Sequence, residues 1–164
     1  MSTTLEINIA KPGQFLAFVL NKQIYGVPIG TVREINRLSE IIPVPRTPDF
    51  VAGVMNLRGK VIPVIFLRSK LGIAHADATK ETCIIVIETN VGQIGMIVDS
   101  VSGVLDLAAN HIEPTPNFGS NSNTEFVIGL GKLDTNVIIL IDIVLALTSN
   151  QLIELAGLGP QKSA

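Results

Sequence analysis

Short apolar runs separated by turn-forming residues fill most of this chain. The runs are rich in Val, Ile and Leu, which are residues that favour strands. Two pairs of runs are each separated by two residues, Asn21-Lys22 and Arg58-Gly59, which is the spacing of a tight hairpin. In the second pair, Gly59 tolerates the positive φ that such a turn needs. The predicted strands are residues 15–20, 23–28, 31–35, 54–57, 60–66, 83–88, 93–98, 100–105, 126–133 and 137–141.

Proline-bearing and polar segments interrupt this pattern. Residues 36–48 and 112–116 carry prolines, which lack the amide donor that a central strand needs, so both are predicted to be crossing loops. Residues 117–124 are rich in Asn, Ser and Gly and predict a flexible loop. Short helical segments are predicted at residues 67–72, from residue 143 onward, and at 151–156.

The two halves of the sequence resemble each other. The offset between matched positions is 69 residues at first, as between 26 and 95, and then grows to 71 and 76, with insertions confined to loops. An internal duplication of a small β unit explains these offsets. The matches are Gly26 with Gly95, Val32 with Val101, Pro43 and Pro45 with Pro114 and Pro116, Gly53 with Gly129, and residues 61–65 with 137–141.

This pattern predicts an all-β protein with short helices, built as two pseudo-repeated small five-stranded β-barrels packed together. Closing a sheet into a barrel removes the edges that would otherwise invite aggregation. The predicted parts are a tail at residues 1–13, a first barrel at about 14–72, a connector at 73–81, a second barrel at about 82–147, and a short C-terminal helix and tail at 151–164.

Composition narrows the function. Hydrophobic residues make up 47% of the chain and charged residues only 16%, so we expect some apolar surface to be exposed for partners. A net charge of −2 without a basic cluster, together with one Tyr and no Trp, argues against a nucleic-acid-binding barrel. The chain has one cysteine, no secretory leader pattern and no apolar run of membrane-spanning length, which predicts a cytoplasmic protein with no direct membrane insertion.

The usual ingredients of an active site are absent from the sequence. His75 and His111 have no neighbouring carboxylate or nucleophile motif that would form an acid-base or metal set. Cys83 opens an aliphatic strand, where nothing nearby in sequence would lower its pKa, so we expect a small buried hydrophobic residue. The sequence predicts a protein that is not an enzyme and needs no cofactor or metal.

Arg58 is a charged residue inside a long, largely aliphatic stretch. It has two interpretations, a solvated turn residue or a paired, half-buried guanidinium, because desolvating an unpaired guanidinium is costly. Under the second interpretation we expect Glu34 to be its partner, since the two residues carry opposite charges within aliphatic strands of the first half. Arg58→Ala should then destabilise the fold as well as weaken binding.

The stretch around Arg58 also resembles a known family. Residues 53–68, Gly-Val-Met-Asn-Leu-Arg-Gly-Lys-Val-Ile-Pro-Val-Ile-Phe-Leu-Arg, resemble the signature of CheW, the chemotaxis coupling proteins, and of the CheW-like domains of CheA and CheV. Residues 95–101, 112–116 and 128–133 extend the resemblance, which covers roughly residues 14–150. The chain is too short to hold kinase domains or an added receiver domain, so it looks like a free-standing member.

The resemblance implies a non-catalytic adaptor that bridges the cytoplasmic tip of methyl-accepting chemotaxis receptors to the regulatory domain of the histidine kinase CheA. It also implies a cytoplasmic protein that is recruited to membrane-associated receptor arrays. An adaptor of another chemosensory pathway, such as type IV pilus motility, would have the same sequence features, and that alternative stays open.

In the resembling family, receptor contacts lie in the groove between the two barrels and kinase contacts at the barrel ends. For the four valine and isoleucine positions that match, core packing is the alternative to contact, and for Gly53 the alternative is backbone geometry. The matching positions are Val32, Glu34, Ile35, Gly53, Asn56, Arg58, Val98 and Val101.

Phe66 departs from the family pattern, which usually carries Asp at this place. The offset of 76 sets Phe66 opposite Asp142, and Asp is among the best N-caps for a following helix, whereas Phe cannot cap. We therefore expect the helical turn after Phe66 to begin later, with Ser69 as its cap, or to fray. The ring either packs into the first barrel or joins a partner-facing patch, and the patch is favoured because a strand end beside Arg68 and Ser69 is a poor place to enclose it.

Overall fold

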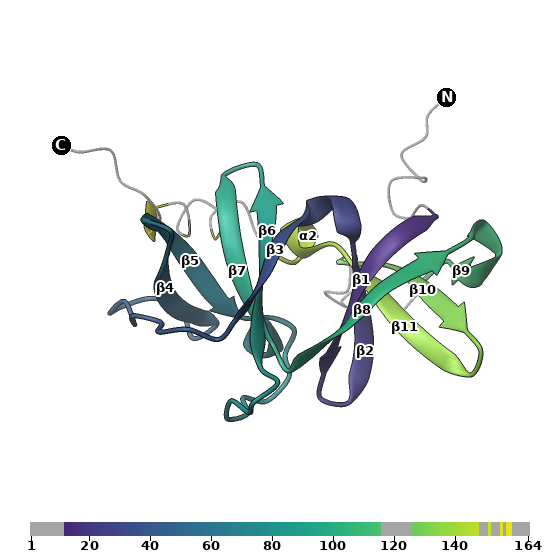
Figure 1. Cartoon of the computed structure of the whole chain (residues 1–164), viewed down its shortest axis with the longest axis horizontal. Coiled ribbons are helices and arrows are strands. Elements are labelled where there is room, and N and C mark those ends of the chain that lie inside the picture. The colour runs from purple at the N-terminus through teal and green to yellow at the C-terminus, as the bar shows by residue number, and fades with distance from the viewer. Residues whose placement is uncertain (1–11, 116–125, 148–150, 152–154, 156, 159–164) are drawn as a thin grey trace. The chain divides into compact units, whose positions relative to one another are not determined.

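The computed structural model describes residues 12–115, 126–147, 151, 155, 157 and 158. Within them the chain is mostly β-strand with short helices, which confirms the predicted fold class (Figure 1). The chain divides into two compact units, one of residues Met1–Ile29 with Val101–Ala146 and one of residues Gly30–Ser100 with Leu147–Ala164. We call them the six-stranded and the five-stranded unit, after their sheets. No helix in the described part of the chain is long and apolar enough to cross a membrane.

The five-stranded unit orders its strands β3-β6-β7-β5-β4. Neighbours are antiparallel except β5 and β7, which run parallel with Val64 opposite Gly95. The aliphatic faces of its strands form the core, which includes the cluster Met55, Ile62, Val64, Ile84 and Val86. The strands are β3 (Val32–Arg37), β4 (Val51–Leu57), β5 (Lys60–Phe66), β6 (Cys83–Thr89) and β7 (Gly92–Val98).

The six-stranded unit has the order β8-β1-β2-β11-β10-β9, with β2 and β11 parallel. Its core includes the cluster Phe15, Leu107, Ile128, Ile138 and Leu140. The strands are β1 (Gly13–Leu20), β2 (Gln23–Pro28), β8 (Ser100–Leu107), β9 (Ile112–Glu113), β10 (Val127–Leu133) and β11 (Asn136–Ile141). Short 3-10 turns, η2 (Ile29–Thr31) and η3 (Ala109–His111), precede β3 and β9.

The two sheets are built from exchanged hairpins, so the predicted barrels of residues 14–72 and 82–147 are wrong in their membership. The β1–β2 hairpin joins the sheet of β8 to β11, and the β6–β7 hairpin joins the sheet of β3 to β5. Within a hairpin, the two strands form backbone hydrogen bonds only along the sides that face each other. The outer side of a hairpin strand must pair with a strand from elsewhere in the chain to extend the sheet. On β2 that partner is β11, with Tyr25 opposite Ile139 and Gly26 opposite Leu140.

The internal repeat survives this exchange. The order β3-β6-β7-β5-β4 matches β8-β1-β2-β11-β10 strand for strand at the offsets that the sequence predicts. Residues 112–116, predicted to be a crossing loop only, begin with β9, which pairs Glu113 with Leu130. The matching position in the other unit is an isolated bridge between Ile42 and Val54, inside the loop predicted at 36–48.

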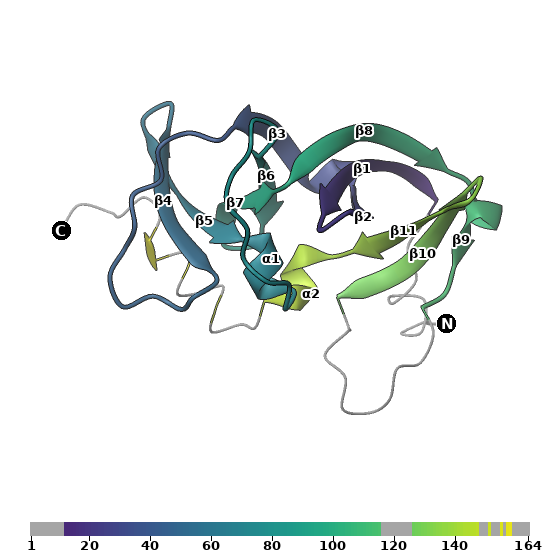
Figure 2. The same cartoon turned by 90° about the horizontal axis from the view of Figure 1, so that it is seen from below.

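The element ends differ from the predictions by a few residues. β3 reaches Arg37 because Asn36 and Arg37 pair with Ile84 and Cys83 on β6. The helical turn α1 covers Leu67–Lys70 and ends short of Gly72, and α2 covers Ile143–Ala146 directly after β11 (Figure 2). The loop at 117–124, most of the tail at 1–13 and most of the helix at 151–156 lie outside the described residues, although Gly13 already belongs to β1.

Candidate partner-binding site

The β4–β5 turn presents Arg58. Leu57 pairs with Lys60, and the two residues between them, Arg58 and Gly59, have φ values of 50° and 87°. Positive φ at both positions is the type I′ geometry, which confirms the predicted tight hairpin. The Asn56 side-chain oxygen accepts the Gly59 amide proton at 2.8 Å and closes the turn. Asn56 therefore has a structural task at the turn while its side chain stays exposed.

Arg58 is an unfavourable residue at this turn position. Asn, Asp and Gly are the residues that adopt positive φ at low cost, and a long side chain adopts it less readily. A residue held in a sparsely populated backbone region is a reason to look for a function of its side chain.

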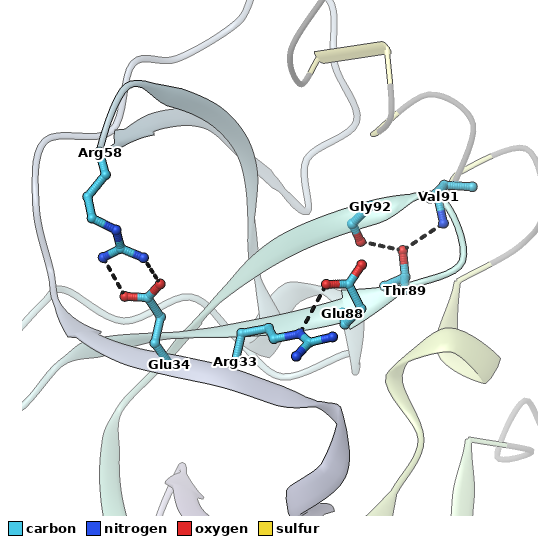
Figure 3. A network of polar contacts seen from close by, with 7 residues as sticks. All are labelled: Arg33, Glu34, Arg58, Glu88, Thr89, Val91 and Gly92. Atoms are coloured by element: carbon cyan, nitrogen blue, oxygen red, sulfur yellow. Dashed lines mark hydrogen bonds and ion pairs between the residues drawn. The ribbon is translucent and has the colours of Figure 1, made fainter.

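Arg58 forms a two-pronged ion pair with Glu34, as predicted (Figure 3). The Arg58 Nη1 donates to Glu34 Oε1 at 3.0 Å, and Nη2 donates to Oε2. The hydrogen bonds from Arg58 hold the pKa of Glu34 below its ordinary value. The predicted half-burial of Arg58 is wrong, because its side chain is 70% exposed while that of Glu34 is 24% exposed. The guanidinium is thus fixed by its partner and open to solvent.

The Arg58–Glu34 pair connects the two outer strands of the five-stranded sheet. Glu34 lies on β3 at one end of the strand order, and Arg58 follows β4 at the other end. The pair therefore joins the first and the last strand of the order β3-β6-β7-β5-β4. A change of charge at either residue can therefore act on both edges at once.

Gly53 serves backbone geometry. It is buried, has a φ of 144°, and sits where β4 is irregular opposite β5. A Cβ at this position would stand 2.1 Å from the Ile42 carbonyl oxygen and 2.7 Å from its carbon. The close approach lets Ile42 and Val54 exchange two backbone hydrogen bonds of 2.8 and 2.9 Å. Gly53 thus allows the crossing loop to pair with the edge of β4.

The four aliphatic candidates differ in exposure. Ile35 is exposed on β3, and Val32 is half-buried at the start of the same strand. Val98 is buried and pairs with Cys83, so core packing accounts for it. Val101 is half-buried on β8 and belongs to the other unit. The five-stranded unit therefore brings Glu34 and Arg58 into contact, with Asn56 closing the turn that carries Arg58. Ile35 is exposed beside Glu34 on β3, while Gly53 and Val98 are buried.

A second charge pair on β3 was missed by the sequence analysis. The register slips between Val32 and Glu34, and the extra residue is Arg33. Such a bulge re-aims side chains. Arg33 Nε donates to Glu88 on β6 at 3.1 Å, next to the β6–β7 turn that Thr89 closes through bonds to Val91 and Gly92 (Figure 3). Register cannot be read from one strand's sequence, which is why this pair escaped prediction.

Exposed aliphatic residues recur at equivalent places in the two units. Ile35 and Val104 are 69 residues apart, and Val61 and Val137 are 76 residues apart, which are the repeat offsets. All four side chains are exposed. In the five-stranded unit this aliphatic surface lies on β3 and β5. In the six-stranded unit it lies on the equivalent strands, β8 and β11. The sequence contains these residues, but exposure depends on which sheet face they take.

Phe66 and Asp142 behave differently at their helices, as predicted. Asp142 caps α2, accepting the Val144 and Leu145 amide protons at 2.9 and 3.4 Å. Phe66 makes no side-chain cap of α1. The expected later start of the turn is wrong, since α1 begins at Leu67. The Phe66 ring is half-buried, edge-on to His75 with centroids 5.1 Å apart, and its place in a partner-facing patch stays a prediction.

Histidine and cysteine side chains do not gather into a metal site. The described part of the chain contains no group of three or more His, Cys, Asp or Glu residues able to hold a metal ion. Cys83 is half-buried at the start of β6, where it lies in register with Arg37 of β3 and Val98 of β7. The His111 Nδ1 accepts the Ala108 amide proton at 3.2 Å, so this imidazole serves the turn before β9.

Comparison with known proteins gives one consistent family. The family model of the CheW-like domain matches residues 14–151. The chain is 38% identical over 139 residues to the chemotaxis protein CheW of Klebsiella aerogenes, which covers 85% of this chain and 84% of that protein. It is 37% identical over 136 residues to the chemotaxis protein CheW of Thermotoga maritima, covering 81% and 86%.

Two further relatives extend the comparison. The crystal structure of the scaffolding protein TtCheW from Thermoanaerobacter tengcongensis matches with a TM-score of 0.77 and 36% identity, covering 85% of this chain and 95% of that one. Protein FrzA of Myxococcus xanthus is 32% identical over 128 residues, covering 77% and 79%.

Proposed function

Because the chain belongs to the CheW family, we infer that it is a non-catalytic adaptor of chemotaxis signal transduction. The observation that carries this inference is the match of the CheW-like domain to residues 14–151, which leaves only short ends of the 164 residues outside it. The structural relative TtCheW is a scaffolding protein, which supports a role in binding rather than catalysis.

The proposed partners are the cytoplasmic tip of methyl-accepting chemotaxis receptors and the regulatory domain of the histidine kinase CheA. An adaptor needs at least two surfaces, and the repeat supplies two similar ones, with exposed Ile35 and Val61 in one unit and Val104 and Val137 in the other. Aliphatic side chains that stay exposed in a charge-poor protein favour contact with partner proteins. Through these partners the protein acts on the cytoplasmic side, at receptor arrays.

The proposed contact residues fall into two groups. Val32, Glu34, Ile35, Asn56, Arg58 and Val101 are proposed to contact partners, since none of them is fully buried. Gly53 and Val98 are proposed to act through the fold, because both are buried. Arg58 is the strongest candidate, being charged, exposed and held in place by Glu34.

Isothermal titration with each partner separately tests this proposal. We expect the chain to bind a receptor-tip fragment and the CheA regulatory domain, and we expect Ile35→Ser to weaken one of the two by about tenfold or more if Ile35 is an anchor. Val44→Ser is the control, because Val44 is a half-buried loop residue outside the proposed contacts. Leu105→Ser would not serve, because Leu105 packs on the core. Absence of binding to both partners would remove the proposal.

The second candidate is an adaptor of another chemosensory pathway, such as type IV pilus motility. The similarity to FrzA, a relative that does not carry the CheW name, is the observation that favours it. Deleting the gene in its own organism separates the two: loss of swimming chemotaxis supports the first candidate, and loss of surface motility alone supports the second.

A further inference from the structure

A pocket of about 230 Å³ opens in the five-stranded unit beside the connector of residues 73–81. Leu38, Phe66 and Ile97 supply apolar walls, and Arg68, Asp77 and Asp99 supply the charged groups. None of these residues belongs to the proposed contact set, and the wall formed by Phe66 exists because this position carries an aromatic ring. At the equivalent position of the repeat, Asp142 uses its carboxylate to cap α2.

Arg68 is already engaged. Its Nε and Nη2 donate to the two Asp99 oxygens at 2.8 and 2.6 Å, and its Nη1 donates to the Ala74 carbonyl oxygen at 2.8 Å. The side chain is only 16% exposed. The Arg68–Asp99 pair is therefore a fixed and internally neutral part of the pocket, and the bond to Ala74 ties the connector to it.

Asp77 is the charge left over in the pocket. Its carboxylate is exposed and makes no hydrogen bond or ion pair with any described residue. With Arg68 and Asp99 neutralising each other, the lining has one uncompensated negative charge. An acidic ligand would be repelled there, and a purely apolar side chain would desolvate Asp77 without giving it a partner.

The combination of apolar walls and one free carboxylate matches an amphipathic cation. Lysine and arginine bury an apolar stem while the charged end meets a counter-ion, and arginine can engage a carboxylate through two parallel hydrogen bonds. We propose that this pocket takes a lysine or arginine side chain presented by a partner protein, with the stem against Phe66, Leu38 and Ile97 and the head at Asp77. That the donor is a protein rests on the proposed adaptor function.

The side-chain chemistry can be tested without any partner protein. Two-dimensional NMR of the full chain would be followed during titration with N-acetyl-arginine methylamide and with its neutral isostere, N-acetyl-citrulline methylamide. We expect saturable shifts at residues 76–78 and at Leu38 and Ile97 with the arginine compound, at least threefold weaker binding of citrulline, and loss of saturation in Asp77→Asn. Asp49→Asn, an exposed aspartate of the same unit outside the pocket, should behave as wild type. Equal binding of both compounds, or no effect of Asp77→Asn, would overturn the proposal.

The partner arm uses charge reversal. Asp77→Lys is expected to weaken binding of the receptor-tip fragment or of the CheA regulatory domain by tenfold or more, with Asp49→Lys unchanged. If wild type and Asp77→Lys bind both partners equally, the pocket proposal fails while the adaptor function stands. If wild type binds neither partner, the adaptor function fails, and the pocket is judged by the arginine titration alone.

Discussion

Gly53 and Ile42 touch through their backbones, with no room for a side chain between them. The Cβ that any other residue would bring to position 53 falls 2.1 Å from the Ile42 carbonyl oxygen. Real carbon and oxygen atoms do not approach so closely without covalent bonding, so the crossing loop or β4 would have to move. This contact explains why a glycine occurs in the stretch that identifies the family.

Gly53→Ala should destabilise the fold by about 3 kcal/mol or more, because the overpacking of a buried contact adds to the strain of a positive φ. Urea unfolding would measure it. Gly92→Ala is the matched control, since Gly92 has a similar φ of 126° in the same unit but nothing within 4 Å of the Cβ that alanine would add. Equal losses in the two variants would contradict the steric account.

Arg58→Asn should leave the free energy of unfolding unchanged or raise it, since Asn suits the positive φ of the turn better than Arg and the ion pair is largely exposed. Partner affinity should fall. The sequence alone predicts destabilisation from a half-buried arginine, and the exposure of Arg58 reverses that expectation. A double-mutant cycle of Arg58→Ala with Glu34→Ala, read in partner binding, should show coupling between the residues; additive effects on binding would contradict a joint role of the pair.

The pKa of Glu34 is lowered mainly by its hydrogen bonds with Arg58. A carboxyl group whose pKa is depressed in the folded state contributes stability above its unfolded pKa, and loses it as the pH falls through the folded value. We therefore expect acid to destabilise wild type more steeply than Glu34→Gln. NMR titration of the Glu34 side-chain carbon should give a higher pKa in Arg58→Asn than in wild type, and an unchanged pKa would contradict the assignment.

Phe66→Asp should change stability by no more than about 1 kcal/mol, because restored capping of α1 offsets the loss of a half-buried ring. The backbone at Phe66, with φ −84° and ψ 106°, already has the extended conformation of an N-cap. Phe66→Ala removes the ring without adding a cap, so it should be less stable than Phe66→Asp by about 1 kcal/mol. A loss of about 3 kcal/mol or more in Phe66→Asp would mark the ring as a core residue.

Much of the fold could be predicted from apolar runs and turn residues, because a strand needs only local alternation and a hairpin only a suitable turn. The exchange of hairpins could not be predicted. The repeat shows that β5 and β11 are alike, but it does not show which of these two strands pairs with β2. Parallel pairing of Tyr25 with Ile139 is decided by contacts far apart in sequence.

The candidate site could likewise be predicted only in part. Glu34 and Arg58 could be matched because they are opposite charges in largely aliphatic segments of the first half, but the exposure of Arg58 follows from its place at the tip of a turn. The Arg33–Glu88 pair depends on a bulge, and the pocket beside Phe66 depends on the path of the connector. Neither leaves a mark in the sequence of a single strand.

Bridging is the central claim, and co-sedimentation tests it most directly. Membranes bearing a methyl-accepting receptor would be pelleted with the isolated CheA regulatory domain, with and without this chain. The account predicts that the regulatory domain enters the pellet in proportion to added chain, and that the chain itself pellets only when receptor is present. A regulatory domain that stays in the supernatant while the chain pellets with receptor, or a chain that never pellets, would contradict it.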